Sequence, residues 1–117
     1  MEHRLSRRVD CDIELLIVKK GIPAAFGRVS NISRHGMFIA TDYQQTGVWQ
    51  PLDIELLSVC NGSRRLRMVV TRKTADGLGV ELEQEISDQA EILALLVTNA
   101  YVDAHPQVAR HGKSLFE

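Results

Sequence analysis

Apolar and polar residues alternate along much of the first 85 positions, which is the pattern of half-buried β-strands. In residues 11–18 apolar side chains occupy every second position, and acidic residues open the opposite face. In residues 66–70 the apolar Leu66, Met68 and Val70 alternate with the preceding Arg65 and with Arg67. A short apolar run at 37–40 follows a glycine. The full pattern predicts six strands, at residues 11–18, 25–32, 37–40, 54–60, 66–70 and 78–82.

Turn-forming residues separate these strands. Asn-Gly at 61–62 and Asp-Gly at 76–77 lie between alternating runs, and such pairs are strong hairpin signals. A Gly-Ile-Pro segment at 21–23 separates the first two strands. Six strands that are mostly joined by hairpins indicate an all-β barrel or sandwich. Residues 43–51 are expected to form a loop that Trp49 pins to the body of the domain.

The hydrophobic period changes after residue 85. From 90 to 101 apolar residues recur at spacings of three and four, which predicts an amphipathic helix that Pro106 ends. Residues 81–109 contain six acidic and no basic residues, so we expect an acidic outer face and an apolar face that closes one side of the barrel. The chain is then divided into a flexible arginine-containing arm at 1–10, the barrel at 11–85, the helix at 86–105 and a tail at 106–117.

Composition narrows the class of protein. The 117 residues are 44% hydrophobic and 25% charged, which is typical of a folded globular domain and not of a disordered chain. A formal net charge of −1 argues against a general nucleic-acid-binding protein covered in positive charge. No apolar run approaches the ~20 residues that span a bilayer. We therefore expect a cytoplasmic protein whose two cysteines, Cys11 and Cys60, are buried reduced thiols.

Known catalytic and metal-binding patterns are absent from the sequence. None of the four histidines is spaced with cysteines or carboxylates as metal ligands are, and no nucleophile elbow, phosphate-binding loop or dinucleotide fingerprint is present. Both cysteines lie at apolar positions, where a thiolate is disfavoured. The sequence therefore predicts neither an enzyme nor a cofactor.

Two polar segments carry the candidate chemistry. Residues 4–8, Arg-Leu-Ser-Arg-Arg, directly precede the first strand, and each guanidinium offers a planar set of donors that suits a phosphate or a guanine edge. Residues 31–36, Asn-Ile-Ser-Arg-His-Gly, lie between the second and third strands. In an extended chain Asn31 and Ser33 leave the same face, and Gly36 permits a positive backbone angle or the close approach of a ligand. Taken singly, each segment also suits a solvated tail or an ordinary polar bend.

Together the two segments resemble the PilZ family of cyclic di-GMP receptors. Its signature is R-x-x-x-R in an N-terminal loop, followed by (D/N)-x-S-x-x-G. Arg4 and Arg8 match the first motif, and Asn31, Ser33 and Gly36 match the second. Residues 77–82 look like the last barrel strand of the family, so the resemblance covers about residues 4–85.

The resemblance implies a six-stranded antiparallel β-barrel with a C-terminal helix. It also implies that Arg4 and Arg8 bind phosphate and a guanine edge, that Asn31 and Ser33 bind the other guanine and its phosphate, and that Gly36 shapes the turn. Arg7 and Arg34 are expected to add further contacts to the same ligand. The implied cyclic di-GMP-binding residues are Arg4, Arg7, Arg8, Asn31, Ser33, Arg34 and Gly36. Asn31 replaces the commoner aspartate, and loss of that charge favours a lower affinity.

The function implied by the resemblance is that of a bacterial second-messenger receptor. Cyclic di-GMP would change the conformation of the domain, which would regulate a protein partner in motility, exopolysaccharide or virulence output. No DNA, RNA or membrane insertion is expected. One alternative is an adaptor of the same fold that no longer binds nucleotide and acts by protein contact. Another is an oligonucleotide-binding barrel that stacks bases, which is disfavoured because only Phe26 and Phe38 lie in strands beside arginines.

Overall fold

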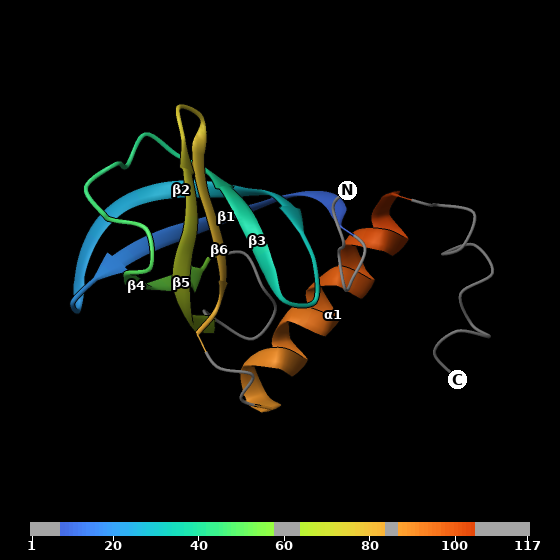
Figure 1. Ribbon diagram of the computed structural model, residues 1–117. Helices are drawn as coiled ribbons and strands as arrows, with labels where there is room; N and C mark the ends of the chain where they lie inside the picture. The colour runs from blue at the N-terminus through green and yellow to red at the C-terminus, as the bar shows by residue number, and fades with distance from the viewer. Residues whose placement is uncertain (1–7, 58–63, 84–86, 105–117) are drawn as a thin grey trace.

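The computed structural model describes residues 8–57, 64–83 and 87–104. The elements are β1 (Val9–Lys19), β2 (Ile22–Ile32), β3 (Gly36–Ala40), β4 (Pro51–Leu56), β5 (Arg64–Thr74), β6 (Gly77–Leu82) and α1 (Ser87–Ala104). The sheet closes on itself in the order β1-β2-β3-β6-β5-β4, and every neighbouring pair of strands is antiparallel (Figure 1). The predicted six-stranded antiparallel barrel with a C-terminal helix is confirmed.

The barrel interior is filled by the apolar residues of the alternating pattern. Side chains at every second position of β4 and of the first half of β5 are almost completely buried, and their neighbours face outward. The core side chains of these two strands and of β1 that are at most 1% exposed are Leu15, Ile17, Leu52, Ile54, Leu56, Leu66, Met68 and Val70. Burial of each such side chain contributes about 1.5–3 kcal/mol, so the alternation that marks the strands also stabilises their closure.

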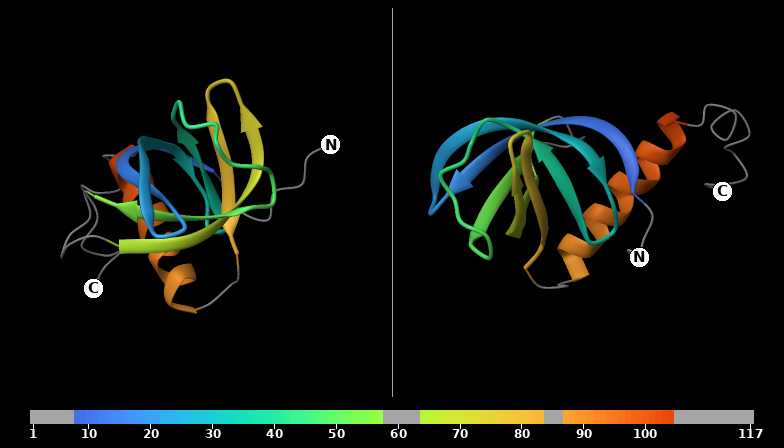
Figure 2. Two further views of the ribbon diagram at one scale, coloured as in Figure 1. Left: turned by 90° about the vertical axis from the view of Figure 1, so that its left-hand side faces the viewer. Right: turned by 45° about the horizontal axis from the view of Figure 1, so that its top comes forward.

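Helix α1 packs across one end of the barrel, mainly against β1 (Figures 1 and 2). Leu93, Leu96 and Ala100 face the barrel and belong to its hydrophobic core. Asp88 and Glu91 lie on the opposite face and are exposed. This arrangement confirms an acidic, amphipathic helix that closes one side of the barrel, although the expected end at Pro106 lies outside the described residues. No helix in the described part of the chain is long and apolar enough to span a membrane.

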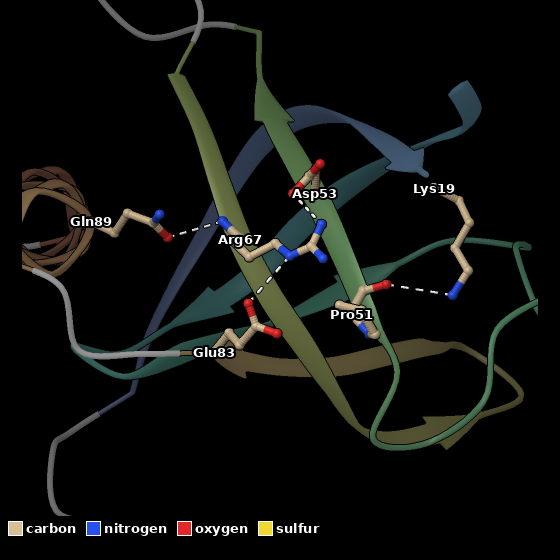
Figure 3. Close-up of polar contacts among 6 residues, drawn as sticks. All are labelled: Lys19, Pro51, Asp53, Arg67, Glu83 and Gln89. Carbon is tan, nitrogen blue, oxygen red and sulfur yellow. Dashed lines mark hydrogen bonds and ion pairs between the residues drawn. The ribbon is translucent and has the colours of Figure 1, made fainter. Parts of the chain in front are cut away.

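Arg67 connects the barrel wall to this helix. Its backbone N–H donates a hydrogen bond to Gln89 Oε1 of α1 at 2.9 Å. Its guanidinium contacts Asp53 Oδ1 on β4 at 3.2 Å and Glu83 Oε1, just after β6, at 3.3 Å (Figure 3). The first turn of α1 is therefore attached to β5 by a hydrogen bond.

Several strands are longer than the hydrophobic pattern predicts. β5 continues to Thr74 rather than residue 70, and β2 begins at Ile22 rather than residue 25. The β1–β2 turn is confined to Lys20 and Gly21, which have φ values of 53° and 80°, so Pro23 already pairs with Val18. The additional residues, such as Ile22 in β2 and Lys73 in β5, are exposed, so they extend the backbone pairing without adding to the pattern of buried positions. β4 ends at Leu56, before the predicted strand end at residue 60, and the turn at 61–62 lies outside the described residues.

The predicted role of Trp49 is wrong. Its side chain is 73% exposed, and its φ of 70° is in the left-handed region. Backbone groups fasten this loop instead, because the N–H of Trp49 donates to the carbonyl of Val70 at 2.6 Å and the N–H of Val70 donates to the carbonyl of Gln50 at 3.0 Å. Lys19 Nζ, which donates to the carbonyl of Pro51 at 3.4 Å, adds a further link (Figure 3).

Candidate ligand-binding site

The two sequence motifs meet where β1 begins and β2 ends. The strand register pairs Val9 with Ile32 and Asp10 with Asn31, which places Arg8 beside the end of β2. Arg8 Nη1 donates a hydrogen bond to Asn31 Oδ1 at 2.8 Å. Two residues 23 positions apart in the sequence therefore form one polar site, which we call the Arg8–Asn31 corner.

Ser33 closes the turn between β2 and β3. It is only 5% exposed, and its N–H donates to the carbonyl of Gly36 at 2.8 Å. Its Oγ accepts the N–H groups of His35 and Gly36, both at 3.3 Å. The extended chain ends at Ile32, so the Ser33 hydroxyl lies within the turn instead of following Asn31 onto one open face.

Gly36 is required by the close packing of two strands. A Cβ at this position would overlap the carbonyl oxygen of Val80 and lie 3.0 Å from the Cα of Glu81. Gly36 is not among the described residues with positive φ. Neither of the reasons expected from the sequence, a positive angle or the approach of a ligand, is therefore needed to explain this glycine. The approach of β3 to β6 fixes the position at which the turn enters β3.

We expect the substitution Gly36→Ala to lower the free energy of unfolding by about 1–3 kcal/mol, because the added methyl group must displace the backbone of β6. Gly79→Ala is the matched control on β6, since its Cβ would meet Arg72 Cβ at an ordinary 3.4 Å. Urea denaturation of both variants measures the difference. Equal stability of Gly36→Ala and the wild type would show that the β3–β6 spacing is not restrictive.

Other arginines of the barrel differ in whether they are paired with a carboxylate. Arg28, Arg65 and Arg67 each contact at least one carboxylate at 2.6–3.4 Å, and the hydrogen bonds that they donate to these carboxylates raise the pKa of the guanidinium groups. Arg34, at the tip of the β2–β3 turn, is exposed next to the Arg8–Asn31 corner. Arg4 and Arg7 lie outside the described residues.

Cys11 is held in its thiol form. Its Sγ lies 3.6 Å from the carbonyl oxygen of Val29, and burial, with smaller contributions from Asp10 and Asp12, raises its pKa to about 11. It lines a pocket of about 490 Å³ between β1 and the second half of α1. The expectation of a buried thiol is therefore wrong for Cys11, which is half-buried and lines this pocket, whereas Cys60 lies outside the described residues. Among the described residues, no group of histidines, cysteines and carboxylates could hold a metal ion.

The raised pKa predicts slow alkylation of Cys11. At pH 8 the thiolate fraction of a group with a pKa of about 11 is about 100-fold below that of a thiol at its ordinary value of 9.0. In a Cys60→Ser variant, iodoacetamide should therefore modify the folded protein far more slowly than the urea-unfolded protein. The rate should rise steeply between about pH 9 and 11, where the thiol ionises. Equal rates in the folded and unfolded protein at pH 8 would contradict the shift.

The closed barrel, with polar groups converging at one corner and a helix across one end, defines the class of a small β-barrel binding domain. A family model of the PilZ domain matches residues 2–98, so the chain belongs to the PilZ family. PilZ domains are binding and adaptor domains. The family expected from the sequence is thereby confirmed.

Two solved structures share the fold. The PilZ domain with c-di-GMP of YcgR from Escherichia coli matches with a TM-score of 0.72 and 12% identity, over 92% of this chain and 98% of that chain. The Bacillus subtilis inhibitor of motility MotI/DgrA matches with a TM-score of 0.64 and 15% identity, over 88% of this chain and 53% of that chain. No curated protein matches the sequence.

Proposed function

We propose that this domain binds cyclic di-GMP at the Arg8–Asn31 corner and transmits binding to a protein partner. The observation that carries the proposal is the 2.8 Å hydrogen bond that joins the two halves of the family signature. Membership of the PilZ family and the similarity to a PilZ domain described with c-di-GMP support the choice of ligand.

The chemistry of the corner suits a ligand with two phosphates and two guanines. A guanidinium binds phosphate or the O6 and N7 atoms of guanine with two parallel hydrogen bonds. Arg8 supplies one such group, and Arg34 is exposed close by. Arg4 and Arg7 would add two more from the preceding segment. Ser33 contributes by holding the turn that carries Arg34 and directly follows the strand end at Asn31.

Asn31 gives this corner a specific property. Before the ligand is bound, the Asn31 amide oxygen accepts the Arg8 guanidinium. An aspartate at this position would form a hydrogen bond between two charged groups, which is stronger than one with a neutral acceptor. The Arg8–Asn31 hydrogen bond therefore competes less strongly with a phosphate than a hydrogen bond to a carboxylate at position 31 would. This effect opposes the weaker contact that a neutral side chain makes to guanine.

Regulation would follow from the position of Arg8 directly before β1. A ligand bound by Arg4, Arg7 and Arg8 would contact both the N-terminal segment and the barrel wall. The surface offered to a partner would then differ between the free and the bound protein.

Isothermal titration calorimetry with cyclic di-GMP tests the proposal. We expect saturable binding that weakens as salt is raised, because phosphate contacts are screened. A labelled single-stranded RNA followed by fluorescence anisotropy is the comparison, and we expect no saturation at the same protein concentrations. Binding of the RNA without binding of cyclic di-GMP would overturn the proposal in favour of an oligonucleotide-binding barrel.

The nucleotide-independent adaptor is the second candidate function. It is favoured by large apolar side chains on the outer surface, since Ile22, Phe26 and Trp49 are 67–73% exposed. Single exposed apolar residues are common, so their exposure alone does not identify an interface. A pull-down with and without cyclic di-GMP separates the two functions. For a receptor, the protein recovered in the pull-down depends on whether cyclic di-GMP is present. For a nucleotide-independent adaptor, the same protein is recovered in both cases.

A further inference from the structure

A row of paired residues crosses the outer wall of the barrel from the Arg8–Asn31 corner. The register pairs Asn31 with Phe38, Phe38 with Gly79, and Gly79 with Arg72. Neighbouring strands lie about 4.7–4.9 Å apart, so the backbones of Asn31 and Arg72 are separated by about 15 Å along the wall. We call these four residues the outer row.

The outer row faces away from the barrel interior. Residues next to its members along the strands, such as Ile32, Met37 and Val80, are almost completely buried in the core. Phe38 is half-buried, and Arg72 is exposed. Because side chains alternate between the two faces of a strand, the row lies on the surface that includes Asn31.

The side chain of Arg72 leans back across Gly79 toward the corner. A Cβ at Gly79 would lie 3.4 Å from Arg72 Cβ and 3.6 Å from Arg72 Nε, so the stem of the arginine passes directly beside this glycine. The guanidinium carbon then lies 5.5 Å from the centroid of the Phe38 ring. This distance is within the range of a cation–π contact.

The charge of Arg72 is not neutralised as those of other surface arginines are. Arg28 and Arg65 are ion-paired with carboxylates. In the part of the chain that the structure describes, Arg72 has no ion pair, and its recorded side-chain contact is the Phe38 ring. The planar guanidinium of Arg72 therefore lies over the ring of Phe38, and Phe38 is on β3, the strand next to the one that carries Asn31.

We propose that Arg72, supported by Phe38, forms a stacking platform for the guanine base whose edge contacts Asn31. This inference rests on the proposed function and extends it. The motif residues offer donors and acceptors to base edges and phosphates, and the platform supplies a flat surface for a base face. Guanidinium planes stack on aromatic rings and bases, and the positive charge also attracts the anionic ligand.

Four proteins titrated with cyclic di-GMP by calorimetry test the platform: the wild type, Arg72→Ala, Arg72→Lys and Arg65→Ala. Arg65 is the matched control, since it is an exposed arginine on the same strand that pairs with Glu55 instead. We expect the Arg72→Ala variant to bind cyclic di-GMP about 10-fold or more weakly than the wild type, because base stacking is lost. Arg72→Lys keeps the charge but loses the plane, so most of the loss should remain. Arg65→Ala should bind as the wild type does.

The outcomes separate the platform from the wider proposal. If the wild type binds and Arg72→Ala binds equally well, the platform is refuted while the Arg8–Asn31 site stands. If Arg72→Lys restores full affinity, charge alone accounts for the residue and stacking is refuted. A wild type that does not bind cyclic di-GMP overturns the proposed function and the platform together. Thermal melts of all variants exclude unfolding as the cause of a loss.

Discussion

The substitution Arg8→Ala is expected to weaken binding of cyclic di-GMP by about 100-fold. Arg8 belongs to the N-terminal motif, and its guanidinium donates the hydrogen bond to Asn31 that forms the corner. A hydrogen bond to a charged group contributes about 1.5–3 kcal/mol, and a bidentate contact to guanine or phosphate comprises two of them. Calorimetric titration at constant ionic strength measures the change.

Arg28→Ala is the matched control for this variant. Arg28 is also an exposed arginine on the outer wall, but Asp12 and Glu14 already pair with it at 2.6 and 3.4 Å. Exposed ion pairs of this kind contribute about 0–1 kcal/mol, so the control should remain folded and bind as the wild type does. An Arg8→Ala protein whose affinity stays within about three-fold of the control would contradict the proposed site.

A second large loss, of about 10-fold or more, is expected for Ser33→Ala. The Ser33 hydroxyl accepts the N–H groups of His35 and Gly36, so its removal leaves two turn amides without this acceptor. A buried amide that loses its partner costs about 1–3 kcal/mol. The turn should loosen, and the arrangement of Asn31 and Arg34 that suits the ligand should be populated less often.

Ser30→Ala separates this effect from a general loss of serine hydroxyls on β2. Its Oγ lies 3.5 Å from the carbonyl oxygen of Phe38, which is long for a hydrogen bond from a hydroxyl, so little stability and little affinity should be lost. Affinity by calorimetry and stability by urea denaturation are measured on both variants. A Ser33→Ala protein that is destabilised but binds with unchanged affinity would show that the turn has no part in ligand binding.

The barrel was predictable because its interior excludes water from one face of every strand. In β5 the buried Leu66, Met68 and Val70 alternate with Arg65, Arg67 and Val69, which face outward. The end of β5 does not follow from this pattern, because the pairing with β6 shifts register between Val70 and Arg72 and the buried alternation stops there. Trp49 was misassigned because its loop is fastened by main-chain groups.

The site was predictable in its residue types and less so in its geometry. The motifs identify Arg8 and Asn31, and the strand register brings them together. The burial of Ser33 within its turn depends on where β2 ends, which the pattern gives only approximately. The contact between Phe38 and Arg72 depends on the pairing of β3 with β6, which are distant in sequence, so no local pattern reveals it.

The most direct test of the central claim is a heteronuclear NMR titration of ¹⁵N-labelled protein with cyclic di-GMP. The claim is that the ligand occupies the Arg8–Asn31 corner. We expect the largest shift changes at Arg8, at Asn31 and in the turn at 33–36. Changes confined to the pocket between β1 and α1, around Asp12 and Asn99, with the corner unaffected, would contradict it.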